Sequence, residues 1–149
     1  MATIKMAPIV EHPIAEHAKE TSVNALQALA APLGRILISL IFITSGYGKI
    51  GAYAGTQAYM ESAGVPGILL PLVIALELGG GIIVLLGWHT RLVAFLLAGF
   101  TLLSAVLFHA GGDSMQGIQF MKNLAIAGGF LMLVAHGAGP YSVDNGWRK

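Results

Sequence analysis

The stretch ILLPLVIALELGGGIIVLLG, residues 68–87, decides the fold. As an α-helix its 20 residues reach about 30 Å, which is the thickness of the hydrocarbon core of a bilayer. Glu77 lies near the middle of the stretch and is its one charged residue. A carboxylate at that depth is costly unless it is neutralised, paired or hydrated. The stretch therefore predicts a membrane span with a polar site inside it.

The composition of the 149-residue chain is typical of a membrane protein. Hydrophobic residues make up 56% and charged residues 10%, whereas soluble domains carry about 25% charged residues. The net charge of +1 offers no basic patch for nucleic acid, so we expect no such partner. The absence of cysteine excludes disulfides, thiolate catalysis and cysteine-ligated iron–sulfur clusters. Any electrons must therefore travel on a bound or diffusible cofactor, and we expect none that is covalently attached.

Apolar segments of membrane-spanning length occur four times in the chain, at residues 32–49, 68–87, 92–110 and 119–137. They predict an all-α, four-helix transmembrane bundle formed by residues 32–149. Residues 1–31 are expected to be a cytoplasmic tail, in which SVNALQALAA (22–31) is a candidate interfacial amphipathic helix. The second and third spans should meet in a tight turn at residues 88–91.

The longer connections are also informative. In the loop 50–66, Thr56 is expected to cap a short helix that Gly64 and Pro66 end. Residues 111–118 are expected to form a polar, glycine-rich loop.

The basic residues predict the orientation of the bundle. With four spans, both termini and the 88–91 turn lie on one side of the membrane. That side holds Lys5, Lys19, Arg35, Arg91, Arg148 and Lys149, and the other holds only Lys49 and Lys122. Because basic residues concentrate on the cytoplasmic side, both termini should be cytoplasmic, in a multi-pass protein of the bacterial inner membrane.

Polar residues should gather in the outer half of the bundle, above Glu77. Glu77 is a candidate proton carrier, because membrane carboxyls often move protons. The groups that share this half with it are Lys122 and His109 as candidate catalytic partners, and Lys49, Gln119 and Asn123 as candidate ligand-binding residues.

A purely structural interpretation of these residues remains open. Glu77 paired with Lys122 or with Lys49 could simply fix how the helices pack, since such pairs add little stability but can specify register. His109 then bonds locally at the membrane interface, and His89 and His136 mark the inner boundary. The histidines are too widely spaced for a metal signature, so no metal site is expected.

Six segments resemble the DoxX family of small bacterial inner-membrane proteins, over about residues 33–144. They are GRILISLIFITSGYGKI (34–50), YMESAGVPG (59–67), VIALELGGGIIVLLGWHTR (73–91), FHAGG (108–112), QFMKNLAIAGGFLML (119–133) and GPYSVD (139–144). The resemblance implies a four-helix membrane bundle. It also implies that the family pattern includes Lys49, Glu77, Arg91, Lys122 and Asn123.

Some members of this family are membrane subunits of a thiosulfate:quinone oxidoreductase, and others are linked to oxidative-stress defence. We therefore expect a quinone-linked, redox-associated subunit whose outer-half site binds a quinone or a small anion. One alternative is a non-catalytic accessory or scaffold subunit of a larger membrane complex. Another is a small carrier or proton pathway, for which a homo-oligomer would have to supply the missing symmetry.

Overall fold

All regular structure among the described residues, 13–111 and 113–146 of this computed structural model, is helical. Residues 1–12 of the predicted tail lie outside the described residues. For residues 13–25 and 27 only the backbone is described. The elements are α1 (Pro13–Gly51), α2 (Tyr53–Ser62), η1 (Gly67–Leu69), α3 (Leu70–Ile74), η2 (Ala75–Gly79), α4 (Gly80–Leu86), α5 (Thr90–His109), α6 (Ser114–His136) and α7 (Val143–Gly146).

Within the described residues, 4 helices are long and apolar enough to cross a bilayer: Ala28–Gly51, Gly67–Leu86, Thr90–His109 and Ser114–His136. They confirm the expected all-helical architecture with four candidate spans. The second span is one continuous rod that runs through η1, α3, η2 and α4. The first span is the C-terminal part of a longer helix, since α1 continues without a break from Pro13.

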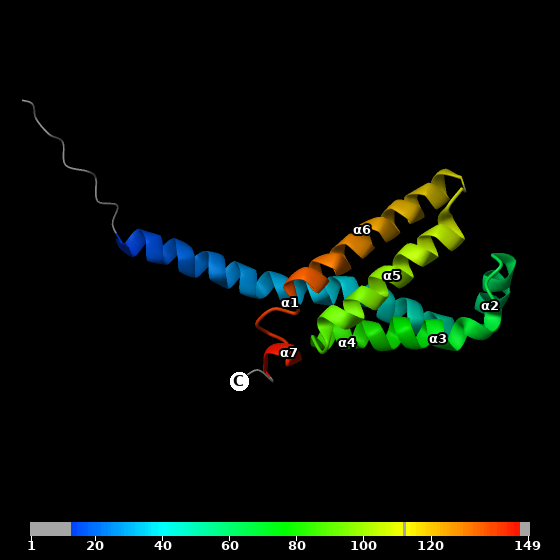
Figure 1. Cartoon of the computed structure of the whole chain (residues 1–149), viewed down its shortest axis with the longest axis horizontal. Helices are drawn as coiled ribbons and strands as arrows, with labels where there is room; N and C mark the ends of the chain where they lie inside the picture. The colour runs from blue at the N-terminus through cyan, green and yellow to red at the C-terminus, as the bar shows by residue number, and fades with distance from the viewer. Residues whose placement is uncertain (1–12, 112, 147–149) are drawn as a thin grey trace, which may run out of the picture.

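The spans are arranged as two helix pairs that meet at one end and splay apart toward the other (Figure 1). In the first pair α1 packs along α3, η2 and α4, and in the second α5 packs along α6. The pairs meet where the α4–α5 turn and α7 lie, which we call the turn end. They diverge toward α2 and the α5–α6 connection, which we call the open end (Figure 1).

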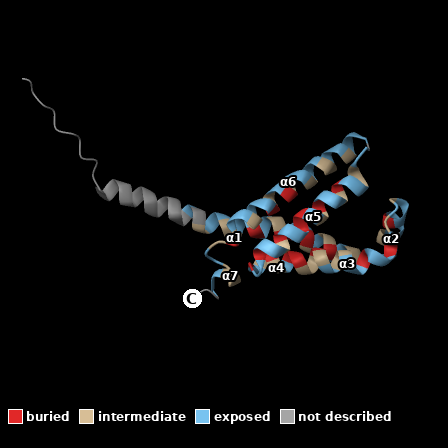
Figure 2. Cartoon of the chain, in the orientation of Figure 1, coloured by how far each residue is buried: buried red, intermediate tan, exposed pale blue. Residues whose placement is uncertain are grey.

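A small apolar core joins the two pairs. Phe42 of α1, Val84 of α4, Leu97 of α5 and Phe130 of α6 are buried together, and the Phe42 and Phe130 rings meet edge to face with centroids 5.1 Å apart. Most other large apolar side chains point outward (Figure 2). Outward-facing apolar side chains are what a lipid environment requires of a four-helix membrane protein.

Two local expectations are corrected. Residues 111–118 are not all loop, because α6 begins at Ser114, where the Asp113 side chain accepts a hydrogen bond from the Gln116 backbone N–H at 3.1 Å. Thr56 does not cap the short helix: α2 begins at Tyr53, and the Thr56 hydroxyl donates to the Ala52 carbonyl from inside it. The expected end is confirmed, because α2 stops at Ser62 and Gly64 has a φ of 77°.

Candidate functional site

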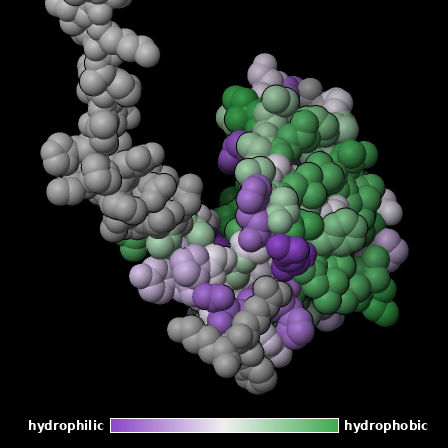
Figure 3. All heavy atoms as spheres, turned by 60° about the vertical axis from the view of Figure 1, so that its left-hand side comes forward, coloured by the Kyte–Doolittle hydropathy of each residue, from purple (hydrophilic) through white to green (hydrophobic). Residues whose placement is uncertain are grey.

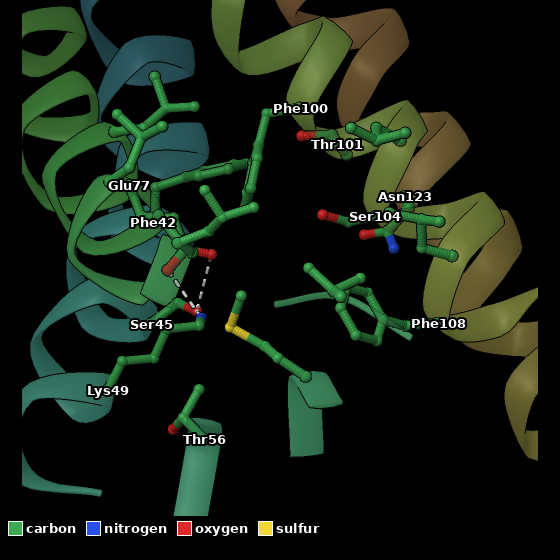
Figure 4. Close-up of a pocket in the computed structure, with 18 of the residues that line it drawn as sticks. Phe42, Ser45, Lys49, Thr56, Glu77, Phe100, Thr101, Ser104, Phe108 and Asn123 are labelled. Atoms are coloured by element: carbon green, nitrogen blue, oxygen red, sulfur yellow. Dashed lines mark hydrogen bonds and ion pairs between the residues drawn. The ribbon is translucent and has the colours of Figure 1, made fainter. Parts of the chain in front are cut away.

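A pocket of about 440 Å³ occupies the space between the two helix pairs toward the open end (Figure 4). Side chains from α1, α2, η1, α3, η2, α5 and α6 line it, and most of them are apolar. A volume of this size and an apolar lining with a few polar groups are typical of small-molecule sites. The polar groups therefore decide what the pocket can bind.

An ion pair lies on the wall formed by the first helix pair. The Lys49 ammonium is 2.7 Å from a Glu77 carboxylate oxygen and also donates to the Ser45 hydroxyl at 2.6 Å. The Ser45 hydroxyl in turn lies 3.4 Å from the other Glu77 oxygen. The Glu77 side chain is 8% exposed and that of Lys49 24%, so the pair is shielded but not sealed. Of the two expected partners, the structure selects Lys49.

Close packing of α1 against the second span brings these groups together. Gly46, one residue after Ser45, lies so close to the second span that an added Cβ would stand 2.8 Å from the Leu78 backbone nitrogen. In the second span, one turn after Leu78, a Cβ on Gly81 would stand 2.9 Å from the Ile43 side chain of α1. Glycine at such contacts lets two membrane helices approach closely. The short Ser45 and Glu77 side chains can therefore reach one another across the contact.

Glu77 sits in a local irregularity of its helix. Residues Ala75–Gly79 form a π-helical turn, η2, inside the otherwise α-helical second span. A π turn inserts an extra residue per turn and is frequent at functional sites. Here the irregularity coincides with the one charged residue of the span.

Polar groups also line the opposite wall, on α5 and α6. Ser104 and Asn123 face the pocket across from the ion pair, as Figure 4 shows. Their side chains form no hydrogen bond with any other described residue, so both are available to a ligand. The Thr101 hydroxyl, by contrast, donates to the Leu97 carbonyl at 2.7 Å.

His109 lies at the open end of the same pocket. Its Nδ1 donates to the Gln116 side-chain oxygen at 2.6 Å. Beside it, the Tyr59 ring of α2 stacks on Phe108, with centroids 5.4 Å apart. This stacking connects α2 to the end of α5, so α2 forms one side of the pocket entrance.

Two expected site residues lie elsewhere. Lys122 and Gln119 do not line the pocket, and the Lys122 side chain is exposed and donates to the Gln119 oxygen at 2.8 Å. The structure therefore brings together Glu77, Lys49, His109 and Asn123 but not Lys122 and Gln119. The role of each of these residues stays a prediction.

Several lining residues were not anticipated from the sequence. Ser45 is the most important of them, and a signal for it existed, because it lies four residues before Lys49 and thus on the same helix face. Ser104 and Tyr59 carried no comparable signal. Both join the site only because α2 and α5 meet at the open end.

The pocket is open toward the lipid as well. Leu72 of α3 and Leu103 of α5 line it although they are 67% and 58% exposed, on surfaces that face the bilayer. An apolar ligand dissolved in the membrane therefore has a lateral route to the ion pair. Among the described residues no group of three or more His, Asp or Glu side chains is placed to hold a metal ion.

Comparisons with known proteins agree with this architecture. Residues 30–110 match the DoxX family. The chain is 53% identical over 120 residues to the inner membrane protein YqjF of Escherichia coli (strain K12), covering 80% of this chain and 92% of the relative. It is 39% identical over 122 residues to the inner membrane protein YphA of the same organism, covering 75% and 86%.

A more distant relative has a name that refers to chemistry. The chain is 34% identical over 73 residues to CatD of Bacillus subtilis (strain 168), and the match covers 49% of this chain and 54% of the relative. The name of CatD describes a candidate oxidoreductase. No solved structure matches the chain. The names of the relatives and the four spans make this protein a multi-pass inner-membrane protein. On the family match and these identities, the chain belongs to the DoxX family.

Proposed function

We propose that the chain is a quinone-linked, redox-associated membrane subunit that binds a quinone in the open-end pocket. In this proposal both termini are cytoplasmic, as the distribution of basic residues predicts, and the pocket belongs to the outer half of the bilayer. The DoxX family and the name of CatD support a redox role. The pocket itself supports the choice of ligand.

The observation that most directly supports a quinone as the ligand is that polar groups lie on two facing walls of an otherwise apolar pocket. Lys49 offers a hydrogen-bond donor on one wall, and Ser104 and Asn123 offer donors on the other. A quinone has an apolar ring with two carbonyl oxygens on opposite edges, so each oxygen finds a donor on a different wall. Its isoprenoid tail is apolar and can leave through the lipid-facing side between Leu72 and Leu103.

Reduction of a quinone to a quinol takes two electrons and two protons. The Glu77 carboxyl would pass one proton, taken up from water at the open end, to the carbonyl oxygen beside it, and water at the open end would supply the second proton to the other oxygen. The Lys49 ammonium would stabilise the negative charge that develops beside Glu77. The electrons come from a donor protein, because this cysteine-free chain carries no thiol-based redox group of its own. The chain is then the quinone-binding part of a larger membrane complex.

One observation disfavours a carrier or proton pathway. The buried Phe42, Val84, Leu97 and Phe130 form an apolar layer between the pocket and the turn end. Among the described residues, this layer separates the ion pair from the buried polar groups nearer the turn end, Ser39, Arg35 and Thr90. A purely accessory role, in which the polar residues fix packing alone, is the alternative that the following experiment distinguishes.

The test is the quinone content of protein purified gently from its native membrane, measured by mass spectrometry. We expect close to one quinone per chain in the wild type and a loss of most of it in Glu77→Gln and in Asn123→Leu, which alter opposite walls. Lys122→Gln is the matched control, because it changes a polar side chain of α6 outside the pocket and should retain the quinone. Wild-type protein without quinone above the level of bulk lipid would refute the proposal and favour the accessory role.

A further inference from the structure

The C-terminal segment is fastened to the α4–α5 turn at the end of the bundle opposite the pocket. The Asp144 carboxylate accepts hydrogen bonds from the backbone N–H groups of His89 and Thr90, at 2.7 and 2.9 Å. Its own backbone N–H donates to the Gly87 carbonyl at 2.9 Å. Asp144 therefore satisfies the first N–H groups of α5 from a distant part of the chain, as an N-cap residue would.

Arg35 lies near this carboxylate. Arg35 is 3% exposed, and its guanidinium donates to the Tyr141 carbonyl and attracts the Asp144 carboxylate electrostatically. Gly87 makes room for it, because a Cβ at that position would overlap the guanidinium. Asp144 is therefore held by backbone donors, within electrostatic reach of Arg35.

A second pocket, of about 430 Å³, lies between this C-terminal segment and the adjoining ends of α5 and α6. His89, Arg91 and His136 line it, and Asp144 is its one carboxylate. Arg91 forms no ion pair with any described residue, and its guanidinium lies against Gly137, where α6 has ended. Because backbone N–H groups occupy both Asp144 carboxylate oxygens, the Arg91 guanidinium is the charged group among the described lining residues that is available to an anion.

The position of this pocket matches the headgroup region of a membrane. It lies at the ends of two spans, beside Trp88, an exposed aromatic residue of the type that favours the membrane interface. The exposed Leu92 at its rim belongs to the apolar surface of α5. In Figure 3, in which this end of the molecule comes forward, hydrophilic side chains gather beside a broad hydrophobic surface.

We propose that this turn-end pocket binds a phosphate group, with Arg91 as its principal ligand and His89 and His136 as additional polar contacts. Arginine suits phosphate because its planar donors match two phosphate oxygens at once. Basic pockets between the ends of membrane helices bind the headgroups of anionic lipids. The site is independent of the quinone pocket, and both leaflets carry phosphate, so it does not depend on the orientation of the bundle.

The experiment titrates delipidated protein in detergent with three probes: short-chain phosphatidylglycerol, short-chain phosphatidylcholine and inorganic phosphate. Bound ligand is counted by native mass spectrometry. We expect phosphatidylglycerol to bind the wild type, Arg91→Gln to weaken binding roughly tenfold, and Arg91→Lys to weaken it less. Lys122→Gln removes the same charge from an exposed position at the other end and should bind like the wild type.

The three probes identify the source of the phosphate group, and phosphatidylcholine shows whether a lipid must carry a net negative charge to bind. Binding of phosphatidylglycerol without inorganic phosphate assigns a lipid headgroup, whereas equally tight binding of inorganic phosphate assigns a free phosphate. Equal affinity in the wild type and Arg91→Gln, or an equal loss in Lys122→Gln, overturns the proposal. Circular dichroism and size exclusion check folding, and His136→Gln replaces Arg91→Gln if that variant does not fold.

Discussion

Glu77 is the residue on which the open-end pocket depends, and its surroundings explain how a carboxylate is tolerated inside a membrane span. Lys49 neutralises it at 2.7 Å, and both groups also contact the Ser45 hydroxyl. Removing one partner of a shielded ion pair leaves the other charge unpaired, which is more costly than losing the attraction alone. The pair therefore behaves as one unit.

A double-mutant cycle tests this coupling. Lys49→Met should lower the free energy of unfolding by about 3 kcal/mol. This is the low end of the loss that follows when a buried ion pair is broken, because Lys49 is partly exposed. Glu77→Gln should lower it less, since the amide oxygen still accepts from Lys49. The double variant should be less destabilised than the sum of the two, measured by reversible unfolding in mixed micelles. Strictly additive losses would show that the two side chains act independently.

Asp144 predicts a dependence of stability on pH. Burial alone raises the pKa of its carboxyl, but the hydrogen bonds from Thr90 and His89, with the charge of His89, outweigh burial and hold the pKa below its ordinary value of 3.8. Below pH 3.8 the unfolded chain therefore binds this proton more readily than the folded one. The stabilisation is complete above about pH 5 and is lost as the pH falls through the folded pKa.

The measurement is the thermal unfolding midpoint of the wild type and of Asp144→Asn between pH 6 and pH 3. The difference between the two proteins should be constant above about pH 5 and should shrink on acidification, because only the wild type loses a charged cap. A difference that stays constant down to pH 3 would mean that the Asp144 charge does not stabilise the fold.

At the scale of the elements, the contact between α1 and η2 determines the geometry of the ion pair. Gly46→Ala should push α1 away from Leu78, because the added Cβ would stand 2.8 Å from a backbone atom that cannot turn aside. We expect a loss of about 1–3 kcal/mol in the free energy of unfolding and a weaker quinone occupancy. Gly48→Ala is the control on the same helix, with no heavy atom within 4 Å, and should change stability little. Equal effects of the two substitutions would contradict the importance of this contact.

The elements also show where prediction from the sequence ends. Length and hydropathy were sufficient to find the four spans and the tight turn before α5, because these depend on the chain itself. Which face of a helix turns inward depends on its neighbours. Lys122 and Asn123 are adjacent, yet they point about 100° apart around α6, and only Asn123 reaches the pocket. The π turn at Glu77 likewise had no recognisable signal in the sequence.

At the scale of the whole molecule, the two pockets lie at opposite ends of the bundle and an apolar layer separates them. The open-end pocket was expected from the polar residues above Glu77, although Ser45 and Ser104 replace Lys122 and Gln119 in it. The turn-end pocket was not expected, since Asp144 is far along the chain from the α4–α5 turn and reaches it only when the C-terminal segment folds back. His89 and His136, which were interpreted as boundary residues, thus line a second pocket.

The orientation of the molecule decides which pocket faces which compartment, and the absence of cysteine makes it directly measurable. In intact cells, a membrane-impermeant maleimide should label Met115→Cys, an exposed position at the open end, and should label Gly146→Cys at the turn end only after lysis. We expect this pattern because basic residues concentrate on the cytoplasmic side of a membrane, and most of those in this chain belong to the side that contains the turn end. The wild type is the unlabelled control. The reverse pattern would place the ion pair in the cytoplasmic half, and the electron donor proposed for the quinone would then have to approach from the cytoplasm.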